Sequence, residues 1–125
     1  MAAALSLAER GVGRTGQNPS VGCIIVKDER VIGRGWTQPG GRPHAEAMAL
    51  AQAGEAARGS TIYVTLEPCA HISQRGSACA QLLAEAEPAR AVIALQDPDP
   101  RTAGSGIMLL KAAGIAVTTD VMVSE

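Results

Sequence analysis

The chain has 125 residues, of which 46% are hydrophobic and 18% charged, and its formal net charge is −1. This length and balance predict a single globular domain with a substantial core, and they exclude a disordered chain. The near-neutral charge and the scarcity of aromatic residues, with Trp36, Tyr63 and no Phe, argue against nucleic-acid binding by charge or by base stacking.

The first half of the chain predicts a helix, a hairpin and a second helix. Ala and Leu dominate the first stretch until Gly11 and Gly13, and the proline after Asn18 opposes helix in the next segment. The pair Asp28-Glu29 separates two apolar runs, which indicates an antiparallel hairpin. The expected elements are a helix over 2–13, a loop over 15–20, strands over 21–27 and 30–36, a loop over 37–43 and a helix over about 44–54.

The second half predicts strands that alternate with helices. Its first strand is rich in β-branched residues, and Pro88 and Gly114 mark the ends of the two helices. The expected elements are strands over 61–66, 90–95 and 115–119, helices over 78–86 and 103–113, and a rigid loop over 96–100. In the earlier helix over about 44–54, the side expected to pack inward holds Ala47, Met48, Leu50 and Ala51.

The order α-β-β-α-β-α-β-α-β predicts an α/β fold. A hairpin followed by β-α-β units implies one mixed sheet of about five strands with helices on both faces, which is a three-layer α/β/α sandwich. Ligand sites in such sheets lie beyond the carboxyl ends of the strands. The run Glu67-Pro68-Cys69 follows directly on the strand over 61–66, so Cys69 is expected at such an end.

The most specific pattern is formed by His44-Ala45-Glu46, Glu67-Pro68-Cys69 and Cys79. One imidazole and two thiolates can hold a zinc ion and leave its fourth position open, as in catalytic zinc sites. The set is typical of zinc-dependent nucleobase deaminases, in which activated water attacks a ring carbon that bears an amino group. Nine residues separate Cys69 from Cys79, where two are usual in that pattern.

Each of these residues also has an ordinary explanation, and the combination is what favours zinc. His44 could cap a helix, Glu46 could complement a helix dipole, and Cys79 could belong to the core. Cys23 lies in an apolar strand and is expected to be a small hydrophobic core residue. Glu67 is expected to orient the site, whereas Glu46 is expected to move protons.

Longer segments resemble one family of enzymes. The segments NPSVGCIIVK (18–27), GGRPHAE (40–46), YVTLEPC (63–69) and QDPDP (96–100) resemble the deaminase domain of the bifunctional diaminohydroxyphosphoribosylaminopyrimidine deaminase/reductases of riboflavin biosynthesis. The resemblance covers nearly the whole chain. It implies a cytidine-deaminase-like fold and hydrolytic removal of an exocyclic amine from a pyrimidinone that carries a ribosylamino 5′-phosphate.

The resemblance also implies a role for each matching residue. It makes His44, Cys69 and Cys79 the zinc ligands and Glu46 the proton shuttle. It places Asn18 in the substrate pocket and His71 and Arg75 near the substrate phosphate, and the loop with Asp97 and Asp99 is a further candidate for substrate binding. Between the two cysteines this chain has AHISQRGSA, one residue more than the family's usual loop, and it lacks that loop's Gly-[Arg/Lys]-Thr-Pro-Pro run.

The remaining expectations concern cofactor, partners and location. We expect Zn²⁺, a phosphorylated pyrimidine substrate, and no nucleic-acid or membrane partner, since no stretch approaches the roughly 20 apolar residues of a membrane span. Three cysteines at ligand spacing without a secretory segment predict a reducing, cytoplasmic setting. The resemblance implies self-association, and it makes residues 1–125 one deaminase domain without the reductase domain. Two alternatives stay open: a deaminase of cytosine, cytidine or guanine, and a catalytically silent zinc-stabilised module.

Overall fold

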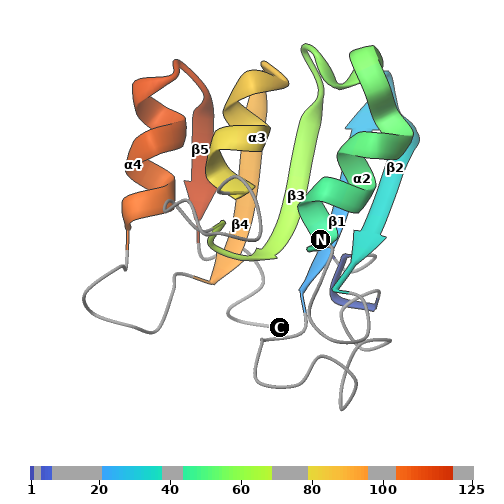
Figure 1. The fold of residues 1–125 in the computed structure, drawn as a ribbon, viewed down its shortest axis with the longest axis horizontal. Helices are drawn as coiled ribbons and strands as arrows, with labels where there is room; N and C mark the ends of the chain where they lie inside the picture. The colour runs from blue at the N-terminus through green and yellow to red at the C-terminus, as the bar shows by residue number, and fades with distance from the viewer. Residues whose placement is uncertain (2–3, 7–20, 38–43, 69–78, 96–103, 120–125) are drawn as a thin grey trace.

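The computed structural model describes residue 1 and residues 4–6, 21–37, 44–68, 79–95 and 104–119. The elements within these residues, labelled as in Figure 1, are β1 (Gly22–Lys27), β2 (Arg30–Trp36), α2 (Ala45–Ala53), the 3-10 turn η2 (Gly54–Ala57), β3 (Thr61–Leu66), α3 (Cys79–Glu85), β4 (Arg90–Leu95), α4 (Ser105–Ala112) and β5 (Ala116–Thr119). Of the helix predicted over 2–13, residues 4–6 are described, and they are helical.

The described strands form one mixed sheet with the order β2-β1-β3-β4-β5. β1 pairs antiparallel with both β2 and β3, whereas β3, β4 and β5 run parallel. The predicted hairpin is confirmed. Its turn residues Asp28 and Glu29 have φ values of 53° and 66°, a left-handed geometry whose twist matches that of the flanking strands.

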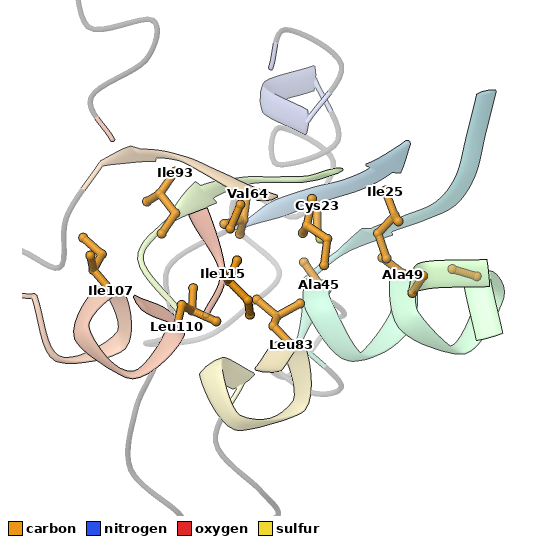
Figure 2. Packing of buried hydrophobic residues seen from close by; sticks show 14 residues of the cluster. Cys23, Ile25, Ala45, Ala49, Val64, Leu83, Ile93, Ile107, Leu110 and Ile115 are labelled. Atoms are coloured by element: carbon orange, nitrogen blue, oxygen red, sulfur yellow. The ribbon is translucent and has the colours of Figure 1, made fainter. Parts of the chain in front are cut away.

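Helices cover both faces of this sheet, as predicted. Helices α2, α3 and α4 lie on one face, over a core that includes Ile25, Val64 and Leu110, and Figure 2 shows these side chains between sheet and helices. The N-terminal helical turn lies on the other face (Figure 2). Its Ala4 packs with Ile24. Within the described residues, no helix is both long enough and apolar enough to cross a membrane.

The predicted packing side of α2 is wrong except at Leu50, which is half-buried and packs against the core. The side chains that the helix buries are those of Ala45, Glu46, Ala49 and Ala53, and Ala51 is exposed. The cause lies in β2, where a Cβ atom on Gly33 or Gly35 would overlap a carbonyl oxygen of α2. The backbones of helix and strand therefore touch, and only a row of alanines spaced four residues apart fits between them.

Gly35→Ala is therefore expected to destabilise the fold. A Cβ at this position would overlap the carbonyl oxygen of Ala45, and a backbone atom at the start of a packed helix cannot swing aside. We expect the free energy of unfolding to fall by about 3 kcal/mol, at the upper end of the range for overpacked cores. Urea denaturation measures the change.

The matched control is Arg34→Ala, at an exposed position of the same strand. It should change the free energy of unfolding by less than about 0.5 kcal/mol, as is usual at the surface. A similarly small change in Gly35→Ala would show that α2 can move away from β2.

The ends of three strands and the starts of three helices lie together at one edge of the sheet, where the candidate site is found. β2, β3 and β4 finish there, and α2, α3 and α4 begin there, at the lower edge in Figure 1. Two buried threonines fix this edge. The backbone N–H of Val21 donates to Thr37 Oγ1 at 2.9 Å, and that of Gly22 donates to Thr65 Oγ1 at 3.1 Å.

Candidate active site

Two of the three predicted metal ligands meet at this edge. His44 is the N-cap residue of α2, and Cys79 is the first residue of α3 with 3% of its surface exposed. His44 Nδ1 lies 3.0 Å from Cys79 Sγ, although the two residues are 35 positions apart in the sequence. The fold therefore brings a nitrogen donor and a sulfur donor to one point.

This donor pair fits zinc. Imidazole nitrogen and cysteine sulfur are the ligands that zinc prefers in proteins, and the usual bond lengths place two donors of one tetrahedral ion about 3.5 Å apart. A separation of 3.0 Å thus requires only a small outward shift to admit the ion. Within the described residues no group of three His, Cys, Asp or Glu side chains could hold a metal ion. The third predicted donor, Cys69, lies outside them.

Glu46 occupies the first turn of α2, two residues after His44, and is only 4% exposed. Its charge is close enough to Cys23 of β1 to influence the ionisation of that thiol. Burial, and then the negative charge of Glu46, raise the pKa of Cys23 well above its usual value. Cys23 is 0% exposed and stays protonated, so its predicted place in the core is confirmed.

A buried glutamate in the first turn of α2, two residues after His44, is a candidate for proton transfer. The role of Glu46 was predicted from its position two residues after His44 in the sequence. The structure adds that Glu46 is buried.

Glu67, the other buried glutamate of the described residues, has a different environment. Its Oε1 accepts the backbone N–H of Gly104 at 2.9 Å, and its Oε2 accepts those of Gly106 at 2.8 Å and Ile107 at 3.2 Å. The carboxylate thus caps the N-terminus of α4. Sequence reasoning expected Glu67 to orient the site but missed these partners, whose one signal was the pair of glycines where α4 begins.

Six predicted site residues lie outside the described residues. They are the proposed ligand Cys69 and the substrate-binding candidates Asn18, His71, Arg75, Asp97 and Asp99. The structure therefore joins His44 to Cys79 and places Glu46 in the turn that follows His44. Thr37 and Glu67 follow the ends of β2 and β3 at the same edge of the sheet.

Comparison with known proteins identifies relatives of this chain. The family described as "Cytidine and deoxycytidylate deaminase zinc-binding region" matches residues 1–95. The "Riboflavin biosynthesis protein RibD" of Escherichia coli is 51% identical over 125 residues, which are 100% of this chain and 34% of that protein. The "Diaminohydroxyphosphoribosylamino-pyrimidine deaminase" of Buchnera aphidicola subsp. Acyrthosiphon pisum is 43% identical, and this chain covers 84% of it.

The fold has a close counterpart among solved structures. Acinetobacter baumannii RibD, form 2, superimposes with a TM-score of 0.93 and 50% identity, over 96% of this chain and 34% of that one. The chain thus spans about a third of the length of the first curated relatives that it matches. The match confirms the three-layer fold expected from the order of elements.

Proposed function

Because the chain belongs to the cytidine and deoxycytidylate deaminase family, we propose that it is a zinc-dependent deaminase of the diaminohydroxyphosphoribosylaminopyrimidine of riboflavin biosynthesis. The reaction is hydrolysis of an exocyclic C–N bond, with water consumed and ammonia released. The relative from Buchnera, most of whose length this chain covers, carries the name of that activity.

One observation supports the proposal most directly. His44 Nδ1 and Cys79 Sγ lie 3.0 Å apart at the start of two helices, and a buried glutamate sits in the first turn of one of them. A mere core role for Cys79 would not require an imidazole nitrogen against its sulfur. With Cys69 as the third ligand, the set would leave one position for water, as catalytic zinc sites do.

In the proposed site, three residues bind zinc and a fourth transfers protons. His44, Cys69 and Cys79 would hold zinc, which when bound makes water a nucleophile near neutral pH. Glu46 would accept a proton from that water and deliver it to the ring nitrogen. Glu46 would then move the second proton, from the hydroxyl group now bonded to the ring carbon, to the amino group, which departs as ammonia and leaves a carbonyl at that carbon.

The buried position of Glu46 suits this role. The residue is only 4% exposed and lies in the first turn of α2, directly after the segment that carries His44, so bulk water is largely excluded from its carboxylate. A carboxylate at the position where the family has its proton shuttle also counts against the silent zinc-stabilised module.

Substrate contacts, assembly and location complete the proposal. We assign Asn18, His71, Arg75, Asp97 and Asp99 to the substrate, with Arg75 as a partner of its phosphate. Residues 1–125 would act as one deaminase domain, self-associated and in the cytoplasm. The sequence resemblance supports the substrate contacts and the self-association, and the three cysteines at ligand spacing support a reducing, cytoplasmic setting.

Ammonia release tests the proposed activity. The zinc-loaded chain should deaminate the phosphorylated pyrimidine, and excess chelator should abolish the reaction. Since hydrogen bonds between charged groups are worth about 1.5–3 kcal/mol, we expect kcat/KM for this substrate to exceed that for cytidine or guanine by about 10-fold to 100-fold or more. Turnover of cytidine or guanine alone would assign a different substrate. Zinc binding without ammonia release from any of the three would identify a silent module.

A further inference from the structure

The carboxylate of Glu67 joins two parts of the chain that are 37 to 40 residues apart. Both of its oxygens are used, in three hydrogen bonds of 2.8–3.2 Å from Gly104, Gly106 and Ile107. The side chain is 6% exposed, so water does not replace these bonds. Charge-assisted bonds to the first N–H groups of a helix are the strong kind, because the helix leaves those donors unpaired and carries a positive end there.

A backbone contact strengthens the same junction. Gly106 lies so close to Pro68 that a Cβ atom would overlap the Pro68 carbonyl oxygen. Gly104, the N-cap of α4, has a φ of 85°, which suits glycine, and it has no side chain with which to cap the helix, so the cap comes from Glu67. Pro68 is therefore held between the end of β3 and the first turn of α4.

Helix α4 also supports the other cysteine-bearing segment. It packs against α3, which begins at Cys79, and Leu83 of α3 belongs to the same core cluster as Leu110 of α4 (Figure 2). Helix α4 therefore contacts both segments: it touches Pro68, the last described residue before Cys69, and it packs against α3, which begins at Cys79. The distance between the two segments depends on how firmly α4 is attached at its N-terminus.

We propose that Glu67 is a positioning residue of the zinc site. By tying Glu67 and Pro68, which lead into the proposed ligand Cys69, to the N-terminus of α4, it fixes the direction in which the chain leaves β3 toward the pair formed by Cys79 and His44. This inference rests on the proposed zinc site. It assigns to Glu67 no proton transfer and no contact with zinc.

Glu67→Gln tests the proposal through zinc affinity, measured by competition with a chromogenic chelator on the full chain. The amide keeps the shape of the carboxylate, but its nitrogen cannot accept, so at least one N–H of α4 loses its acceptor. We expect zinc affinity to fall about 10-fold to 100-fold, as is usual when a residue that orients a metal ligand is changed. The melting temperature of the metal-free chain should also fall by several degrees.

Ile25→Val is the matched control for stability. Ile25 is fully buried in β1 and pairs with Ile62 at the start of β3, the end opposite to Glu67. Its truncation should lower the melting temperature and leave zinc affinity unchanged. If Glu67→Gln also lowered only the melting temperature, Glu67 would be a structural cap and the proposal would be overturned.

Gly106→Ala approaches the same junction from the other side. It keeps the charge of Glu67 but forces the Pro68 carbonyl away, so it should weaken zinc binding in the same direction, including in the case where Glu67→Gln does not fold. Zinc affinity equal to that of the wild type would overturn the proposal. A wild-type chain that binds no zinc would instead overturn the proposed function itself, which separates the two failures.

Discussion

Glu46→Gln is expected to lower kcat/KM for ammonia release by about 1,000-fold, within the range that positioned proton transfer contributes. The amide fits the space of the carboxylate but cannot take a proton from water or return one to the ring. Zinc should remain bound, because Glu46 is not among the proposed ligands. Kinetics together with the zinc content per chain measure both expectations.

The stability of this variant separates a catalytic role from a structural one. Glutamine keeps the shape of glutamate and one of its two acceptor oxygens, so most of the packing around this position is preserved. The melting temperature should therefore stay within a few degrees of the wild type. Glu55→Gln, the same substitution at an exposed position of η2, should change neither turnover nor stability. A zinc-loaded Glu46→Gln enzyme with nearly normal turnover would refute the assignment.

Cys79→Ser is expected to abolish turnover by removing the metal. A serine hydroxyl is not deprotonated at neutral pH and is a poor zinc ligand, so we expect zinc affinity to fall by about 100-fold or more. The imidazole of His44 would also lose the sulfur that lies 3.0 Å away. Metal analysis after dialysis and the ammonia assay report the two losses.

Cys23→Ser supplies the matched control because it makes the same chemical change in the core. Cys23 is fully buried in β1, and a hydroxyl there lacks a guaranteed partner, so stability should fall by about 1–3 kcal/mol with zinc still bound. A chelator should then lower the melting temperature of the wild type and of Cys23→Ser, because both lose a bound ligand. It should leave Cys79→Ser unaffected. Equal zinc affinity in Cys79→Ser and the wild type would remove Cys79 from the site.

The strands show how much of the fold local sequence predicts. The predicted bounds 30–36, 61–66 and 90–95 agree with β2, β3 and β4. Thr61–Leu66 is a continuous β-branched and apolar run between two turns, as expected for a strand buried in a parallel pair. The order of elements predicted one mixed sheet of about five strands, and the structure adds the order β2-β1-β3-β4-β5 within that sheet.

The part of the candidate site that lies within one short motif could be predicted from the sequence. His44 and Glu46 share a helical turn, so their spacing along the chain already places them together. The pairing of His44 with Cys79 was expected from the residue types, and the structure adds the contact of 3.0 Å between them. The roles of Cys69, Asn18, His71, Arg75, Asp97 and Asp99 stay predictions.

The sequence by itself determined the order of elements, the strands and the zinc-type donor set, because each depends on residues that are close along the chain or on a specific motif. The tertiary structure alone decided which face of α2 is buried and what Glu67 binds. Helix α2 is apolar on most sides, and its buried face follows from the two glycines of β2 that let the backbones touch. The partners of Glu67 begin 37 residues later in the chain. Such contacts arise from the close approach of distant backbones, which no local pattern of side chains encodes.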